Sequence, residues 1–374
     1  MKIVFCTQNM APFRMKWMDE VARYHEVHIF HLDEYEAGVN KKYISYVPER
    51  AAVHCEKRTL PGNHAIYREV SVLTGQADLI ILDGYGFAGQ LHLMLRLHWK
   101  KIPFLLSVDG GMAKQKERFW MRAVKTFFVS RASAYLSTSE DTDRFIQYYG
   151  GGRKTIYRHY FSGLSKAYVE KAAISKEQKY ALRKELHLKN GFLVLVVGKF
   201  EFRKGFDLML RALDGIGEQN QLCVCFIGAS GWHNYEPYLT DRNRNKVCFV
   251  DFCGQNILKK YYLAADLMLL PTRYDAWGLV IPEAMANGIP VVTTRMCLAG
   301  RAMLEPEELI PAENVDAIRK IILKYMQMPE EERMKIGDRN IQRVQPYIIE
   351  NAVLKDIRHF EEFVNERKNT GNTG

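Results

Sequence analysis

Short apolar runs of strand length alternate with longer amphipathic stretches along the whole chain, and this feature constrains the fold most strongly. In the first half the apolar runs lie at 2–6, 26–30, 77–82, 103–108, 133–138 and 154–158. In the second half they lie at 192–198, 222–228, 246–252, 266–271, 290–294 and 308–311. Such alternation is typical of βαβ units, which build parallel sheets with helices on both faces. The sequence therefore predicts an α/β fold.

The alternation breaks between residues 160 and 190, where a charged, helical stretch rich in Lys and Glu precedes a new apolar run. We therefore predict two Rossmann-like, doubly wound domains, and 374 residues fit two domains of roughly 150 residues each. The expected parts are an N-terminal domain, a linker, a C-terminal domain and a helical tail, at 1–165, 166–190, 191–335 and 336–374.

The composition restricts the partners and the compartment. The formal net charge of +10 favours a phosphate-bearing partner, whether nucleic acid, anionic lipid or a small anion. No RNP, zinc-finger or helix-turn-helix pattern is present, so we expect no nucleic acid partner. There is no run of 18 apolar residues, and the first apolar run turns polar at Gln8, which does not fit a signal peptide. The seven scattered cysteines form no CxxC pair, so we expect reduced thiols and a cytoplasmic protein.

The most informative segment is RYDAWGLVIPEAMANGIPVV at 273–292, which follows one apolar run and leads into the next. Asp275 lies in the loop, and Glu283 is expected to open a helix. The backbone N–H groups of Trp277, Gly278, Leu279 and Val280 suit an anionic phosphate near that helix. A carboxylate at Glu283 suits a sugar diol such as a ribose, although it could instead only complement the helix dipole.

A second segment, VVGKFEFRKGFDLMLRAL at 196–213, places cations directly after an apolar run. Lys199 and Lys204 could clamp a diphosphate and stabilise the charge that develops on a leaving group, with Arg203 in support. The alternative is a solvated basic turn without a ligand.

Together the two segments resemble the donor site of family 4, group 1 glycosyltransferases, which are retaining enzymes of the GT-B fold. That family carries E-x-F-G-L-x-x-x-E-A-x-A-x-G-x-P-V, preceded by G-R-x4-K-G. The chain departs from the pattern at Asp275, where the family has Glu, and at Lys199, where it has Arg. The resemblance implies that Asp275 contacts hydroxyls of the transferred sugar and that Glu283 contacts the ribose. It also implies that Gly228 and Phe252 border the nucleobase.

The resemblance implies further properties of the whole chain. The two domains would face a central cleft, the first binding the acceptor and the second a nucleoside-diphosphate sugar, and the C-terminal helix would cross back to the first domain. No metal and no further cofactor would be needed. The single Asp-x-Asp, at 141–143, is interpreted as a helix start and not as a metal motif.

The first half matches the family only in outline. The family usually has a His at the end of a mid-domain strand, where this chain has Asp109 and no His. Asp109 could orient the acceptor hydroxyl or accept its proton, or it could only shape the turn before Gly110. We place Asn9, Gly84 and Gly86 on the acceptor side with it.

Two other functions stay open from the sequence. Gly84, Gly86 and Gly89 form Gly-x-Gly-x-x-Gly, and Asp109 follows twenty residues later, which is typical of an NAD-dependent oxidoreductase. That interpretation leaves the motifs at 199–204 and 275–283 unexplained. The substitutions at Lys199 and Asp275 also allow a non-catalytic protein that binds sugar nucleotides on a GT-B scaffold.

A basic, aromatic stretch at 112–131 has two interpretations. From 114 to 131 it holds six Lys or Arg and one Glu, with four interleaved aromatic residues. It could rest on an anionic membrane surface near a lipid-linked acceptor, or it could bury its aromatic rings inside the first domain.

The expected function is transfer of a hexose-type sugar from a nucleoside-diphosphate sugar to a glycan or lipid-linked acceptor, with retention at the anomeric carbon. Synthesis of polysaccharide or cell-surface glycan is the expected role, in the cytoplasm or at the inner face of the membrane.

Overall fold

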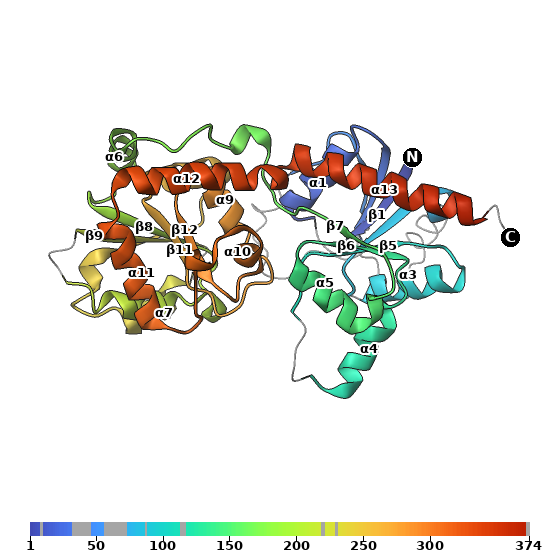
Figure 1. Ribbon diagram of the computed structural model, residues 1–374, viewed down its shortest axis with the longest axis horizontal. Coiled ribbons are helices and arrows are strands. Elements are labelled where there is room, and N and C mark those ends of the chain that lie inside the picture. Colours follow the sequence, from blue (N-terminus) through green and yellow to red (C-terminus); the bar gives the residue numbers. More distant parts are fainter. Residues whose placement is uncertain are drawn as a thin grey trace. The chain divides into compact units, whose positions relative to one another are not determined.

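The computed structural model describes residues 1–7, 10–31, 46–55, 73–86, 88–112, 117–217, 221–228 and 231–371. The chain divides into two compact units, Met1–Ser165 together with Tyr347–Gly374, and Lys166–Pro346. Each unit contains one parallel sheet with helices packed on it (Figure 1). The predicted α/β class with two Rossmann-like parts is therefore confirmed. No helix in the described part of the chain combines the length and the apolar character needed to cross a bilayer.

The first unit is built on a seven-stranded sheet of order β3-β2-β1-β4-β5-β6-β7, in which all neighbours are parallel. Its strands are β1 (Lys2–Thr7), β2 (Glu26–His31), β3 (Ala52–Cys55), β4 (Leu79–Asp83), β5 (Leu105–Val108), β6 (Ala134–Ser137) and β7 (Ile156–Arg158). Its helices include α1 (Pro12–Val21), α3 (Ala88–Trp99), α4 (Phe119–Val129), α5 (Glu140–Ile146) and α13 (Ile349–Gly371). The Asp-x-Asp at 141–143 lies in the first turn of α5, as predicted.

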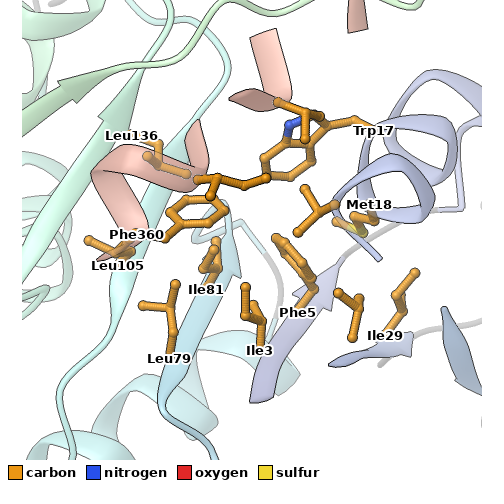
Figure 2. Packing of buried hydrophobic residues seen from close by; sticks show 14 of the residues in the cluster. Ile3, Phe5, Trp17, Met18, Ile29, Leu79, Ile81, Leu105, Leu136 and Phe360 are labelled. Atoms are coloured by element: carbon orange, nitrogen blue, oxygen red, sulfur yellow. The ribbon is translucent and has the colours of Figure 1, made fainter. Parts of the chain in front are cut away.

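The core of the first unit joins the two ends of the chain. Ile3 and Phe5 of β1 are fully buried against Trp17 of α1 and Phe360 of α13 (Figure 2). The rings of Phe5 and Trp17 meet edge to face, with centroids 5.1 Å apart. Helix α13 contributes large buried side chains to this core and packs beside α1. Burial of such side chains is the main source of stability.

A buried polar contact also fastens α13. Asp356 is fully buried and accepts a hydrogen bond from Nε1 of Trp17 at 2.8 Å, and it lies 3.0 Å from Nδ1 of His159. Burial lowers the pKa of His159, but the Asp356 carboxylate and then Asp109 raise it, so that the net pKa lies above the usual 6.5. The part of the expected tail that belongs to the first unit begins at Tyr347, and the preceding helix belongs to the second unit.

The second unit is built on a six-stranded parallel sheet of order β10-β9-β8-β11-β12-β13. Its strands are β8 (Phe192–Val197), β9 (Leu222–Ile227), β10 (Val247–Val250), β11 (Leu267–Leu270), β12 (Val291–Thr294) and β13 (Leu309–Ile310). Its helices are α6 (Lys176–Glu185), α7 (Phe206–Leu213), α8 (Gln255–Ala264), α9 (Val280–Ala286), α10 (Leu298–Met303), α11 (Val315–Gln327) and α12 (Glu330–Val344).

The segment at 166–190, expected to be a linker, is instead part of the second unit. Its helix α6 starts with a capping box at Ser175 and carries Arg183, whose side chain is only 1% exposed. The Arg183 guanidinium donates to the Ala264 carbonyl at 2.9 Å and to Asp266 at 2.7 Å. A buried, paired arginine ties α6 to the residues directly before β11, which a free linker would not do.

Both sheets reverse their direction of winding between two neighbouring strands. In the first unit this switch point lies between β1 and β4, and in the second between β8 and β11. Ligands of open parallel sheets bind beyond the carboxyl ends of the strands at such points. The residues that follow these four strands are therefore the first place to look for a site.

Candidate functional site

Two loops meet at the switch point of the second unit. The loop after β8 carries Lys199, Arg203 and Lys204, and the loop after β11 carries Asp275. The loops pack so closely that a Cβ atom on Gly205 would lie 2.0 Å from the Pro271 carbonyl oxygen. Gly205 also has a φ of +72°, which favours glycine. The Lys-Gly pair thus places Lys204 next to the second loop.

Lys204 and Asp275 form a close ion pair. Nζ of Lys204 donates to Oδ2 of Asp275 at 2.5 Å, and the two side chains are only 9% and 10% exposed. Arg203 is exposed, pairs with Glu201 at 2.7 Å and approaches Asp275 at 3.8 Å. Lys199 is exposed on the same loop. Two of the residues predicted to carry the chemistry are therefore in direct contact.

The loop after β11 is fixed by its backbone. The Asp275 N–H donates to the Met296 carbonyl at 2.9 Å, and the Ala299 N–H donates to the Trp277 carbonyl at 2.8 Å. Gly278 has a φ of +93°, and a Cβ there would lie 2.7 Å from the Cys297 sulfur. The Trp277 indole is 5% exposed and packs in the core. Leu279 and Val280 follow half-buried, at the start of α9.

Glu283 lies in the first turn of α9, which begins at Val280, three residues earlier than expected. The Tyr262 hydroxyl donates to Oε2 of Glu283 at 3.0 Å. Burial, and then the Glu283 carboxylate, raise the pKa of Tyr262 well above its ordinary value. Tyr262 therefore acts as a neutral donor that orients the carboxylate. Its place on α8 gave no signal in the sequence.

Gly228 and Phe252, expected beside a nucleobase, follow β9 and β10. A Cβ on Gly228 would lie 1.9 Å from the Gly198 carbonyl oxygen, so the loops after β8 and β9 also touch. Phe252 is 37% exposed. Trp232, which follows β9, stacks on Phe249 of β10, with ring centroids 5.0 Å apart. Sequence reasoning did not identify this aromatic stack.

In the first unit, Asp109 is held by a residue that sequence reasoning missed. The guanidinium of Arg14 on α1 pairs with both Asp109 after β5 and Asp83 at the end of β4. The Thr7 hydroxyl donates to Asp83 at 2.8 Å. The Asp109 side chain is 20% exposed, whereas that of Asp83 is 5% exposed. Two carboxylates sharing one cation leave negative charge, which suits a hydroxyl donor.

The other residues predicted on the acceptor side are Gly84, Gly86 and Asn9. Gly84 follows β4 with a φ of +82°, and its N–H donates to the Ser107 carbonyl at 3.1 Å. Gly86 is exposed in the next turn, and Asn9 lies outside the described residues. The glycine fingerprint runs from the end of β4 into α3, whereas dinucleotide-binding proteins carry it after the first strand.

Helix α4 exposes most of its apolar side chains. Phe119 is 84% exposed, Trp120 51% and Phe127 43%. Of the four aromatic rings, only that of Phe128 packs against the core, so the interpretation that the helix buries its aromatic rings is wrong. Arg122 lies over the Tyr148 ring at 4.2 Å and stays exposed. Lys114 and Lys116 lie outside the described residues.

Within the described residues, no three His, Cys, Asp or Glu side chains gather closely enough to hold a metal ion.

Part of the chain matches a known protein family. Residues 178–343 match the family model "Glycosyl transferases group 1". This range contains both loops of the site. The predicted resemblance to this family is therefore confirmed for that part of the chain.

Two curated relatives are an uncharacterized glycosyltransferase of Methanocaldococcus jannaschii, 32% identical over 32% of this chain, and lipopolysaccharide glucosyltransferase WaaG of Escherichia coli, 29% identical over 37%. The matches span 32% and 40% of those proteins. A solved structure of HepE from Anabaena, in complex with UDP, is similar with a TM-score of 0.78 and 18% identity, covering 97% of this chain and 100% of that one. The likeness confirms the GT-B fold class.

Proposed function

We propose that this protein is a retaining, metal-independent glycosyltransferase that transfers a hexose-type sugar from a nucleoside-diphosphate sugar to a hydroxyl group of a glycan or lipid-linked acceptor. The observation that carries the proposal is the buried contact between Lys204 and Asp275 at the switch point of the second unit. It lies within the range that matches group 1 glycosyl transferases. The similar HepE structure was solved with UDP, which supports a nucleotide donor. Retention rests on the family resemblance.

Each site residue then has a chemical role. The bond between the anomeric carbon and the diphosphate oxygen breaks, and its electron pair stays on the diphosphate. Lys204, with Lys199 and Arg203 on the same loop, stabilises that charge more in the transition state than in the ground state. Asp275 accepts hydrogen bonds from hydroxyls of the sugar. Glu283, held by the Tyr262 hydroxyl at 3.0 Å, accepts them from the ribose.

The donor loops also offer groups that could contact the nucleotide. The N–H groups of Gly278, Leu279 and Val280 at the start of α9 would contact the diphosphate. Gly228 and Phe252 would border the base at the ends of β9 and β10. In the first unit, Asp109 would bind the acceptor hydroxyl, with Gly84, Gly86 and Asn9 around it.

The decisive test is the turnover of Lys204→Ala, measured as nucleoside diphosphate released from a panel of sugar nucleotides. We expect kcat to fall by about 10²–10³, the usual effect of losing one preorganised charge contact. Lys199→Arg should be tolerated, because its planar fork fits phosphate oxygens. The matched control is Lys335→Ala, which removes an exposed lysine from α12. Wild-type turnover in Lys204→Ala would remove this residue from the mechanism. No release from any donor by the wild-type protein would favour a non-catalytic binding protein.

A specific observation supports a second proposal, that the protein works at the cytoplasmic face of an anionic membrane. Phe119, Trp120 and Phe127 lie on one face of α4, because Phe127 follows Phe119 by eight and Trp120 by seven residues, about two helical turns. Arg118 and Arg122 are exposed on the same helix segment. Exposed aromatic rings flanked by arginines fit the boundary between lipid headgroups and acyl chains. Each basic residue near such a surface adds about 1 kcal/mol. The acceptor would then be lipid-linked, in the synthesis of polysaccharide or cell-surface glycan.

Sedimentation with vesicles tests this surface. The protein should pellet with phosphatidylglycerol vesicles at low salt, remain in solution with phosphatidylcholine vesicles, and be released by high salt. Phe119→Ser with Trp120→Ser should abolish pelleting and leave hydrolysis of a donor intact. Ile257→Ser, at a residue 51% exposed on α8, is the matched control. Equal pelleting with both lipids, or none with either, would contradict the membrane proposal.

A further inference from the structure

Arg273, two residues before Asp275, uses its side chain to connect three parts of the second unit. Its guanidinium makes a two-pronged contact with Asp207 in the first turn of α7, at 2.8 and 2.7 Å. The same group donates to the Phe202 carbonyl at 2.7 Å and to Glu313 at 3.0 Å. It also lies 3.7 Å from the centre of the Phe202 ring. These contacts hold the planar Arg273 guanidinium in a single orientation.

The backbone beside Arg273 makes the same connection. The Arg273 N–H donates to the Arg203 carbonyl at 2.8 Å, and the Thr272 hydroxyl donates to that same oxygen at 2.9 Å. Arg203 directly precedes Lys204 in the chain. The peptide that leads into Lys204 is therefore held by the loop that carries Asp275.

Two carboxylates, one buried and one exposed, compensate the charge of Arg273. Asp207 is only 4% exposed at its side chain, and Glu313 supplies a second carboxylate. The hydrogen bonds that Arg273 donates to Asp207 raise the pKa of Arg273 despite its partial burial. A guanidinium already matched by two carboxylates is a poor ligand for a donor phosphate. Arg273 therefore differs in role from Lys204, although both lie at the same switch point.

We infer that Arg273 and Asp207 are positioning residues, which hold the loop of Lys204 and the loop of Asp275 in one register and so set the contact between the departing diphosphate and the Lys204 ammonium group. This inference rests on the proposed function. A shift of about 1 Å in a group that contacts the reacting atoms can cost about 10² in rate. Loss of the fork should therefore lower kcat and leave the affinity for the donor nearly unchanged.

The test is a double-mutant cycle between positions 273 and 204, with steady-state kcat and KM for the donor measured for each variant. Arg273→Lys should lower kcat at least tenfold, with KM for the donor changed less than threefold, because an ammonium group keeps the charge and loses the fork. Asp207→Asn should act in the same direction. Arg319→Gln, which removes a half-buried guanidinium of α11 paired with Asp316, is the control and should keep wild-type rates.

The cycle separates positioning from simple loss of stability. If Arg273 acts through Lys204, the double variant Arg273→Lys with Lys204→Ala should be no slower than Lys204→Ala alone. The inference would be overturned if Arg273→Lys lowered kcat by the same factor in the wild-type protein and in Lys204→Ala. It would also be overturned if Arg273→Lys kept the wild-type kcat. If Lys204→Ala itself keeps full turnover, the proposed function of the site fails instead. Should Arg273→Lys melt at a much lower temperature, hydrogen exchange of residues 199–205 in Asp207→Asn decides, because unchanged protection there would also overturn it.

Discussion

Replacing Asp275 by asparagine should tighten the binding of a free nucleoside diphosphate and at the same time abolish most turnover. In the structure the Asp275 carboxylate accepts a hydrogen bond from the Lys204 ammonium group at 2.5 Å, and both side chains are about one-tenth exposed. A diphosphate must share that ammonium group with a carboxylate of its own sign. The asparagine amide would keep the shape of the side chain and remove the competing charge.

The size of the effect follows from Coulomb's law. A phosphate oxygen that contacts Lys204 would lie about 5 Å from the Asp275 carboxylate, and two unit charges at that distance repel by about 3 kcal/mol at an effective dielectric constant of 20. Partial solvation and the loss of a hydrogen bond between Asp275 and Lys204 reduce the net gain to about 1–2 kcal/mol. This corresponds to a dissociation constant lower by about 5–30-fold.

Calorimetry with uridine, guanosine or adenosine diphosphate, whichever binds the wild-type protein, measures the first half of the prediction. Release of nucleoside diphosphate from the sugar nucleotide measures the second, and we expect kcat to fall by about 10² because the sugar loses its carboxylate contact. Asp316→Asn, at an exposed carboxylate of α11, is the control. Weaker or unchanged diphosphate binding in Asp275→Asn would show that Asp275 serves only to hold Lys204 in place, and the reasoning would fail.

Three further predictions concern the donor, metals and pH. Glu283→Gln should weaken donor binding by about 1–3 kcal/mol in calorimetry, because it removes charge from two hydrogen bonds, and an unchanged dissociation constant would remove Glu283 from the site. Turnover should survive EDTA, since Lys199 and Lys204 supply the positive charge, and a loss that manganese or magnesium restores would contradict metal independence. The raised pKa of His159 means that its pairing with Asp356 stabilises the fold fully below the usual 6.5 and that this contribution is lost as the pH rises through the folded-state pKa. The urea midpoint of the wild-type protein should therefore fall over that range more than the midpoint of Asp356→Asn, and parallel curves would refute the assignment.

The sequence predicts the strands of both sheets well, because buried parallel strands are short, nearly continuous apolar runs. Each apolar run named from the sequence is a strand. The additional strand β3, Ala52–Cys55, contains a histidine and only two aliphatic residues, so its burial depends on pairing with β2. The sequence predicts a linker around Arg183 because its many charges are typical of a solvent-exposed segment. Burial of Arg183 depends on Asp266, far along the chain, and no local pattern carries that information.

The site residues also fall into those that the sequence predicts and those that it does not, and the strand order explains the difference. Lys204 and Asp275 were recognised from motif spacing, but their contact exists only because β8 and β11 are neighbours in the sheet. Residues at the ends of two strands meet when the strands pair, and sequence order does not reveal which strands pair. Arg14 and Arg273 were missed for this reason, since each matters through carboxylates that the strand order brings to it. Motifs identify the groups that contact a ligand, whereas the groups that orient them become visible only when the topology is known.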